Sequence, residues 1–253
     1  MAEADAELHN RLIYYVLPTI IVCYITFRWC GFKKAKFQAF LCNLVCSYVH
    51  NKFCKKEKTL LFDQMKNYEK SRSKTHAAFT ILEIGAGSGM NFKFFPPGSE
   101  VTCLDPNPYN EKYIIDNLRK ADNNIRLVKF IKGFAENMPD VPSDNFDAVV
   151  CTFTMCSIRR LNDAVEEIKR ILKPGGHFFY LEHVAAPKGS WIRYFQDKLQ
   201  CIWPYISDGC NINRETWNIL DHSNFKEVQY CHFSASTWLA FFARPGLYGS
   251  AIK

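Results

Sequence analysis

The stretch that decides the fold is ILEIGAGSG, residues 81–89, in which an apolar run leads directly into Gly85, Gly87 and Gly89. Such a run is typical of a buried strand, and glycine permits the tight turn and close backbone approach that a ligand needs beyond it. The spacing is GxGxG. A dinucleotide-binding turn has GxGxxG, and Met90 stands where its third glycine would be. The turn indicates a ligand site without identifying the ligand.

A second apolar run, VTCLD, ends in Asp105, about 20 residues after Gly85. An acidic side chain at this position can accept hydrogen bonds from both ribose hydroxyls of an adenosine. The alternative is that Asp105 only shapes a turn before Pro106. Because the glycine turn and the acid occur together, the sequence favours a cofactor that contains adenosine.

From about Thr59 onward, apolar runs alternate with amphipathic helical stretches. The expected strands cover residues 80–84, 101–104, 125–131, 146–151, 178–184 and 228–233, and the expected helices include 111–120 and 163–172. This alternation predicts an α/β fold with a mostly parallel, Rossmann-like sheet and helices on both faces. Ligands bind beyond the carboxyl ends of the strands in such sheets.

Nine sequence strings carry a family resemblance. LEIGAGSG, VTCLDPNP, GFAENMP, FDAVVC and LKPGG, in this order, resemble the class I S-adenosylmethionine-dependent methyltransferases. NFKFFPPGSEVTCLDPNP, VVCTFTMCSI, FYLEHVA and SDGCNINRETW are similar to the membrane-bound alkyl thiol S-methyltransferases of animals, the methyltransferase-like proteins of endoplasmic reticulum and lipid droplets. The resemblance covers about residues 58–253. It implies S-adenosylmethionine as cofactor and methyl transfer to a small lipophilic thiol.

The same resemblance implies a set of cofactor-binding positions. Glu83 and the glycine turn would surround the methionine part, and Asp105 would bind the ribose. Phe134 departs from the pattern, because many class I enzymes carry there an aspartate that reads the adenine amino group. The implied cofactor-binding residues are Glu83, Gly85, Ala86, Gly87, Gly89, Asp105, Pro106, Asn107, Ala135, Glu136, Cys151 and Thr152.

His183 is the candidate catalytic residue. It follows the apolar run FFYLE, so we expect it at the carboxyl edge of the sheet. A thiol acceptor must become a thiolate, whose free pKa is ~8.5, and an imidazole suits proton transfer near neutrality. The alternative is a structural cap on the strand. Asp208 and Cys210 are further candidates, with a turn formed with Gly209 as the alternative for Asp208. Arg214 and Glu215 are expected to begin a helix.

The aromatic segment 191–205 falls between two late strands. It predicts an apolar cover over the acceptor site, with packing against the sheet as the alternative. The chain has 11 cysteines but no CxxC pair, and its histidines are not at metal-ligand spacing from them. The pattern predicts reduced thiols in a cytosol-facing protein and no metal site.

Residues 12–27, LIYYVLPTIIVCYITF, form an uncharged apolar run followed by basic residues, which favours a membrane anchor with the remaining chain in the cytosol. A signal peptide is the competing reading. Residues 37–48 have the spacing of an amphipathic helix, at a membrane surface or in the core. We therefore expect an anchor over 1–57, a catalytic domain over 58–253 and a location at the endoplasmic reticulum membrane, with lipid droplets as a further site.

The net charge of +7 is concentrated in lysines near the anchor, which favours anionic lipid over nucleic acid as a partner. Two other functions stay open at this point. One is a methyltransferase acting on carbon or oxygen of a membrane lipid or quinone. The other is a scaffold protein of lipid droplets that keeps the fold without catalysis.

Overall fold

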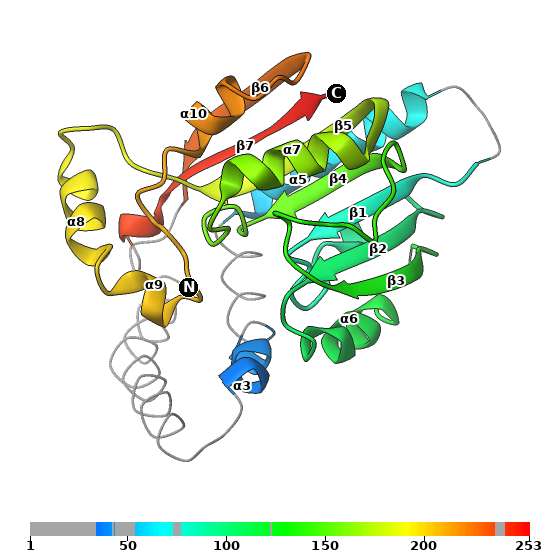
Figure 1. Cartoon of the computed structure of the whole chain (residues 1–253), viewed down its shortest axis with the longest axis horizontal. Helices are drawn as coiled ribbons and strands as arrows, with labels where there is room; N and C mark the ends of the chain where they lie inside the picture. The colour runs from blue at the N-terminus through cyan, green and yellow to red at the C-terminus, as the bar shows by residue number, and fades with distance from the viewer. Residues whose placement is uncertain (1–33, 42, 44–53, 73–76, 122, 236–240) are drawn as a thin grey trace, which may run out of the picture.

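The computed structural model describes residues 34–41, 43, 54–72, 77–121, 123–235 and 241–253. Its centre is a seven-stranded sheet in the order β3-β2-β1-β4-β5-β7-β6 (Figure 1). The strands are β1 Thr80–Ile84, β2 Glu100–Asp105, β3 Arg126–Lys132, β4 Phe146–Thr152, β5 Leu172–His183, β6 Glu227–Ser234 and β7 Pro245–Ile252. Strands β1 to β5 run parallel, and β7 is antiparallel to both β5 and β6. The predicted α/β fold with a mostly parallel sheet is confirmed.

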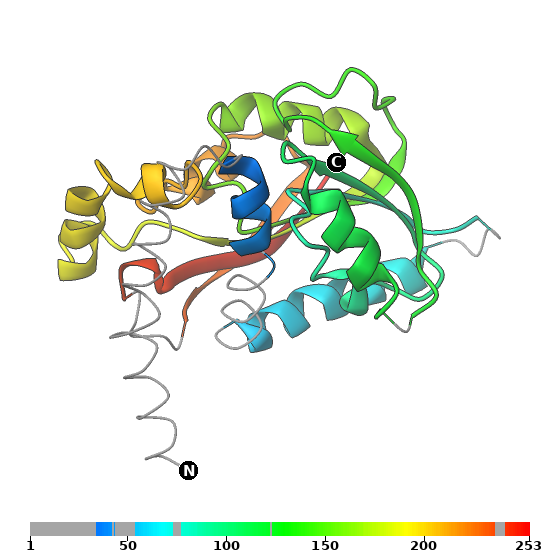
Figure 2. The ribbon, with the colours of Figure 1, turned by 90° about the horizontal axis from the view of Figure 1, so that it is seen from below.

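Helices cover both faces of the sheet. The α-helices are α3 Lys34–Leu41, α5 Lys55–Ser71, α6 Asn110–Leu118, α7 Leu161–Ile171, α8 Trp191–Leu199, α9 Trp203–Ile206 and α10 Thr216–Asp221, with 3-10 turns at η3 Phe92–Phe94 and η4 Phe241–Ala243. α5 and α7 lie on opposite faces (Figure 2). α3 and α9 lie beyond the carboxyl ends of the parallel strands (Figure 1).

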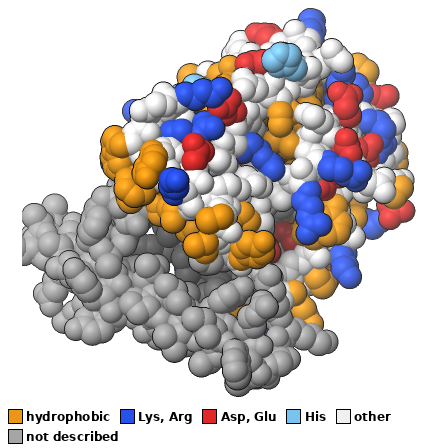
Figure 3. Space-filling model, turned by 60° about the vertical axis from the view of Figure 1, so that its left-hand side comes forward, with side chains coloured by type: hydrophobic (Ala, Val, Ile, Leu, Met, Phe, Trp, Pro, Cys, Tyr) orange, Lys and Arg blue, Asp and Glu red, His pale blue; other side chains and the backbone are white. Residues whose placement is uncertain are grey.

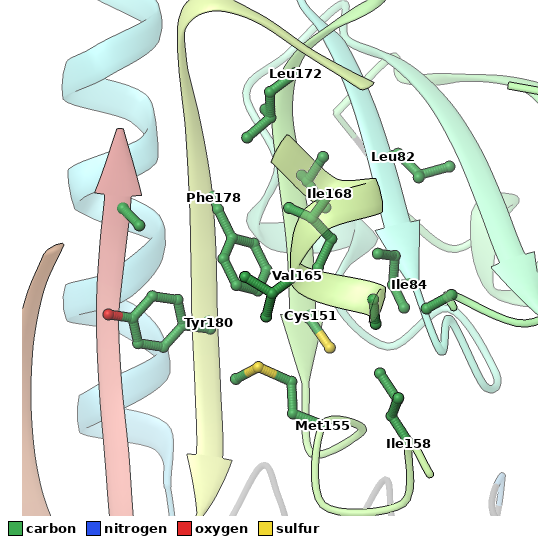
Figure 4. Close-up of a cluster of buried hydrophobic side chains, with 14 of the residues drawn as sticks. Leu82, Ile84, Cys151, Met155, Ile158, Val165, Ile168, Leu172, Phe178 and Tyr180 are labelled. Atoms are coloured by element: carbon green, nitrogen blue, oxygen red, sulfur yellow. The ribbon is translucent and has the colours of Figure 1, made fainter. Parts of the chain in front are cut away.

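Two apolar cores result from this layering. On one face, Val165 and Ile168 of α7 pack against Leu82, Phe178 and Tyr180 of the sheet (Figure 4). The other core contains buried residues of α5 and α6 that pack against the opposite face: Leu61, Phe62, Met65 and Ile114. Burial of each such side chain stabilises the fold by about 1.5–3 kcal/mol. The cores therefore fix the sheet whose edge carries the candidate site.

The observed elements agree with most of the predicted ones. The six expected strands occur with their ends displaced by a few residues, except that β5 begins at Leu172. The LKPGG string therefore forms the first residues of β5, directly after the end of α7 at Ile171. β7 was not predicted, because the glycines in PGLYGSAI weaken its strand pattern. α5 crosses residue 58, the expected domain boundary, and its Leu61 is fully buried.

The predicted anchor, residues 12–27, lies outside the described residues. Of the predicted amphipathic helix, residues 37–41 belong to α3, and most of the remaining part is also outside them. None of the helices within the described ranges is both long and apolar enough to cross a bilayer.

Candidate active site

The predicted site residues gather at one edge of the sheet, where the parallel strands end. Gly85 follows β1, Asp105 ends β2, Thr152 ends β4 and His183 ends β5. Because β1 lies between β2 and β4, these carboxyl ends are neighbours in space. The sequence prediction that the site lies beyond the carboxyl ends of the strands is therefore consistent with where its residues lie.

The glycine turn has the backbone conformation that its sequence indicates. Gly85, Gly87 and Gly89 all have positive φ, at 64°, 52° and 75°. A Cβ atom on Gly85 would lie 2.2 Å from Oγ1 of Thr154. The turn thus requires glycine at Gly85 for two reasons, the left-handed backbone and the close approach of Thr154.

Asp105 connects the turn to the loop after β2. Its Oδ2 accepts a hydrogen bond from the backbone N–H of Gly87 at 2.9 Å, and its Oδ1 accepts one from the N–H of Asn107 at 2.8 Å. Each carboxylate oxygen has a further lone pair for another donor. Burial raises the pKa of Asp105, and these two hydrogen bonds oppose the rise. The carboxylate is therefore positioned to accept hydrogen bonds from a ribose.

Glu83 is buried beside the turn, with 2% of its surface exposed. Its Oε1 accepts a hydrogen bond from Nδ2 of Asn91 at 2.7 Å, whereas Oε2 accepts none from any residue that the structure describes. Burial raises the pKa of Glu83 to about 8, against the opposing effects of Asn91 and Lys58. A buried carboxylate oxygen without a donor suits a cationic ligand group, such as the amino group of S-adenosylmethionine.

Asn91 is a site residue that the sequence analysis missed. Its Nδ2 donates to Oε1 of Glu83 and also to Oγ1 of Thr152 at 2.9 Å, so it links the ends of β1 and β4. A buried amide directly after a glycine turn was the available signal. Lys58 was missed as well: it is 2% exposed, and burial lowers its pKa to about 8 while Glu83 opposes that shift.

The residues predicted for the adenine side lie on loops at the same edge. Nδ2 of Asn107 donates to the carbonyl of Ala35 in α3 at 2.8 Å, and Pro106 is exposed. Ala135 is buried, and Oε1 of Glu136 accepts hydrogen bonds from the backbone N–H groups of the residues before α7, at 3.2 and 3.4 Å. Their contact with a cofactor stays a prediction.

Two further predicted residues differ in their surroundings. The side chain of Cys151 is fully buried in the apolar cluster with Met155 (Figure 4), and burial raises the pKa of its thiol well above the usual value. Its backbone pairs with β1 on one side and β5 on the other, and its contact with a cofactor stays a prediction. Ala86 packs in the opposite core and is 5% exposed, which agrees with a small residue in the turn.

His183 ends β5 with both ring nitrogens occupied. Nδ1 lies 3.0 Å from Oε1 of the fully buried Glu182, and Nε2 lies 2.8 Å from Sγ of Cys210. Indole Nε1 of Trp203 donates to the same sulfur at 3.3 Å. Hydrogen bonding from Cys156 and the charge of His183 lower the pKa of Cys210, against the effect of burial. Burial lowers the pKa of His183, but the charge of Cys210 and the hydrogen bond to it raise the pKa by more, so the pKa of His183 is raised overall. The imidazole of His183 and the thiol of Cys210 therefore form a closely hydrogen-bonded pair.

The segments around this pair differ in part from the sequence expectations. Arg214 does not begin a helix: α10 starts at Thr216, and Nη1 of Arg214 donates to the carbonyl of Ile158 at 2.6 Å. Asp208 has a φ of 55°, and together with Gly209 it forms the turn that was the alternative to a catalytic role. Its Oδ1 accepts a hydrogen bond from Nε2 of Gln38 in α3 at 2.9 Å.

α3 thereby touches both sides of the candidate site. It is bound to the loop after β2 through Ala35 and to the turn before Cys210 through Gln38. Figure 2 shows it crossing this end of the sheet. The aromatic segment is divided between α8 and α9: Trp203 contacts Cys210, whereas Trp191 and Tyr194 are about three-fifths exposed. Only part of this segment therefore covers the site.

Comparison with known proteins gives a consistent assignment. Residues 82–180 match a family described as "Methyltransferase domain". The solved structure of a putative methyltransferase from Bacillus halodurans superposes with a TM-score of 0.55 at 14% identity, covering 77% of this chain and 98% of that one. It supports the fold alone.

Two curated relatives are closer in sequence. The human thiol S-methyltransferase TMT1A is 34% identical over 226 residues, which are 89% of each chain. The Rattus norvegicus thiol S-methyltransferase TMT1B is 39% identical over 173 residues, which are 68% of this chain and 69% of the relative. The chain is a methyltransferase with S-adenosylmethionine as cofactor, and it belongs to the family of the thiol S-methyltransferases TMT1A and TMT1B.

Proposed function

We propose that this protein methylates small lipophilic thiols at a membrane surface, with S-adenosylmethionine as the methyl donor. The observation that carries the proposal is the contact of His183 with Cys210 at the same carboxyl edge of the sheet as the glycine turn. Membership in the thiol S-methyltransferase family supports the acceptor class.

The residues of the turn fit the donor. Asp105 would accept hydrogen bonds from its ribose, and Oε2 of Glu83, which has no donor among the described residues, would accept one from its amino group. When bound, the donor supplies a methyl group on a positively charged sulfur, and an acceptor thiolate takes the methyl carbon while the bonding electron pair remains on the donor sulfur. The task left to this chain is to position the acceptor and to remove its proton.

His183 provides for proton removal together with Cys210. With Nε2 of His183 hydrogen-bonded to Sγ of Cys210, the pair is placed to accept the proton of an entering thiol. Glu182 fixes the imidazole through Nδ1 and stabilises its charged form. The side chain of His183 is 16% exposed, and we propose that the acceptor approaches this exposed part. A weak base suffices, because the positive charge of the donor favours the thiolate.

Apolar side chains near this end of the molecule support the membrane part of the proposal. Trp191, Tyr194 and Phe195 of α8 are 59%, 60% and 41% exposed and contact one another edge to face. Figure 3 shows hydrophobic side chains gathered on one face of the molecule. Aromatic side chains of this kind suit a membrane–water interface. We place the protein at the endoplasmic reticulum membrane and lipid droplets, facing the cytosol, with residues 12–27 as the anchor.

The test is an acceptor screen with methyl-labelled S-adenosylmethionine and the full chain. We expect label on alkanethiols and little on alkanols or phenols of matched size. In the His183→Ala variant, turnover should fall most for thiols of high pKa, while cofactor affinity stays near that of the unmodified chain. Label on membrane lipid or quinone would replace the thiol assignment. Absence of cofactor binding would indicate a non-catalytic scaffold.

A further inference from the structure

Three side chains of types that often bind metals in proteins converge at the carboxyl edge of the sheet. Cys156 lies in the loop after β4, His183 ends β5 and Cys210 follows α9. Each residue offers one ligand atom, and these three atoms lie within 4.8 Å of one another. Two thiols and one imidazole are a ligand set that suits zinc, and a set of three protein ligands leaves one coordination position for a substrate.

Groups around these three residues orient them toward one another. Oε1 of Glu182 binds Nδ1 of His183, which directs Nε2 at the sulfur of Cys210. A carboxylate on the outer nitrogen of a ligating histidine is a regular feature of zinc sites. Trp203 donates its indole N–H to the sulfur of Cys210, which favours the thiolate that a metal requires.

The backbone also keeps the two thiols close. The carbonyl of Cys156 accepts a hydrogen bond from the N–H of Asn211 at 3.0 Å and another from Nδ2 of Asn211 at 2.9 Å. Oε2 of Glu182 accepts one from the N–H of Cys156 at 3.2 Å. The loops that carry Cys156 and Cys210 are thus joined to each other and to the end of β5, so the cluster is fixed by hydrogen bonds outside it.

A disulfide between Cys156 and Cys210 is the competing use of the same thiols. That bond would require an oxidant, and it gives no role to the imidazole or to the carboxylate behind it. A metal site uses all four groups. Binding would replace the hydrogen bond between Nε2 and Sγ and separate these atoms from 2.8 Å to roughly 3.6 Å, the distance set by the usual zinc–sulfur and zinc–nitrogen bonds. This movement is small for side chains at the ends of loops.

We propose that Cys156, His183 and Cys210 bind a zinc ion whose fourth position takes the sulfur of the acceptor thiol. The second half rests on the proposed function. With the ion bound, coordination takes the place of proton removal by His183 and Cys210: it lowers the pKa of the acceptor thiol, so the acceptor binds as a thiolate and its proton leaves to the solvent. The site would thereby select a soft sulfur acceptor over an alcohol of the same shape.

The first experiment uses Co²⁺ as a spectroscopic probe on the reduced full-length protein. We expect one equivalent to bind with a thiolate-to-cobalt charge-transfer absorption that Zn²⁺ abolishes. Cys156→Ser and Cys210→Ser should each weaken binding at least tenfold, whereas Cys201→Ser, which changes an exposed thiol of the same region, should leave it unchanged. Circular dichroism and cofactor affinity confirm that each variant is folded.

Equal binding by the two cluster variants and the unmodified chain would overturn the site. So would a Cys156–Cys210 disulfide found by mass spectrometry in air-exposed protein that takes up no metal. In a second experiment, an alkanethiol should shift the cobalt spectrum and an alkanol of equal length should not. A cobalt spectrum that does not change when the alkanethiol is added would overturn coordination of the acceptor. Metal binding without any thiol methylation would instead contradict the proposed function and leave the metal site standing.

Discussion

The carboxylate of Asp105 accepts a hydrogen bond from the backbone N–H of Gly87, with 2.9 Å between Oδ2 and the nitrogen. The contact joins the two motifs that the sequence marks for the cofactor, the glycine turn after β1 and the acidic end of β2. The same carboxylate binds Asn107 through its other oxygen. Asp105 therefore supports the shape of both loops in addition to its predicted contact with ribose.

Replacing Asp105 should weaken cofactor binding strongly. A hydrogen bond to a charged group contributes about 1.5–3 kcal/mol, so Asp105→Ala should lower the affinity for S-adenosylmethionine more than tenfold. Asp105→Asn should lose less, because an amide oxygen still accepts one backbone hydrogen bond. Isothermal titration calorimetry measures both. Asp140→Ala, at an exposed position, is the control. Unchanged affinity in Asp105→Ala would show that the cofactor lies elsewhere.

A comparison of two glycines separates backbone strain from close contact. Gly85 and Gly98 have φ values of 64° and 75°, but no described atom lies within 4 Å of a Cβ built on Gly98. Gly98→Ala should therefore lower the free energy of unfolding by about 1–2 kcal/mol through the left-handed backbone alone. Gly85→Ala adds the clash with Thr154, which a rotamer change does not relieve, because even Cβ of Thr154 lies 2.7 Å away.

We expect the clash to add about 1–3 kcal/mol to the loss in Gly85→Ala. Chemical denaturation of both variants measures the difference. Equal losses would mean that the turn moves away from Thr154 at little cost. Such a result would contradict the rigid turn described here.

Much of the fold follows from local patterns in the sequence. β1 and β2 are buried and read as apolar runs, and they end at recognisable residues, β1 just before Gly85 and β2 at Asp105. β7 was missed because Gly246 and Gly249 interrupt its pattern, while its partners β5 and β6 supply the pairing. Strand pairing of this kind is a property of the whole sheet and is not readable from eight residues.

The candidate site was predictable where one segment carries the signal. His183 and Cys210 were each named from the sequence, but their contact was not, because 27 residues separate them and only the sheet edge brings them together. Cys156 was not named as a candidate from the sequence, and it is buried beside the pair. The sequence expectation of no metal site used ligand spacing along the chain. Spacing along the chain does not reveal side chains that converge from three separate segments, as those of Cys156, His183 and Cys210 do.

Asp147 connects the amino ends of several elements and should stabilise the fold. Its Oδ2 accepts hydrogen bonds from the N–H and hydroxyl of Thr80, at 2.9 and 2.8 Å, and its Oδ1 contacts Lys173 and Arg72, each at 2.9 Å. Asp147→Asn should lower the free energy of unfolding by roughly 1–3 kcal/mol near neutral pH. Asp163→Asn removes a surface pair with Arg160 and should cost less than about 1 kcal/mol.

The effect of Asp147 should depend on pH. Burial tends to raise its pKa, but hydrogen bonds from Lys173 and Thr80 outweigh burial, so the folded pKa lies below the usual value. A lowered folded pKa means that the stabilisation is complete above the unfolded pKa of about 3.9 and is lost as the pH falls through the folded pKa. The difference between the unmodified chain and Asp147→Asn should be constant down to about pH 5 and shrink below about pH 4. A difference that stays constant into strong acid would contradict the lowered pKa.

Membrane attachment should separate into an anchor and a surface contribution. The full chain should resist extraction by alkaline carbonate, whereas a chain shortened to begin at Lys34, the first residue of α3, should be released. The cut at Lys34 keeps the contacts of Ala35 and Gln38 with the site, which a cut at the expected boundary of residue 58 would remove. Cofactor affinity should therefore be the same in the full and the shortened chain. Carbonate release of the full chain would exclude an integral anchor.

The exposed aromatic side chains of α8 should account for what binding remains in the shortened chain. Burying an aromatic side chain contributes about 1.5–3 kcal/mol, so Trp191→Ser combined with Tyr194→Ser should reduce co-sedimentation with anionic vesicles by at least tenfold. Ile115→Ser is the matched control, because Ile115 is 37% exposed on α6, a different helix. Both side chains of the double variant are exposed, so the free energy of unfolding should change little. Equal co-sedimentation of the double variant and the control would show that α8 does not face the membrane, because loss of its aromatic side chains would then matter no more than loss of an apolar side chain elsewhere.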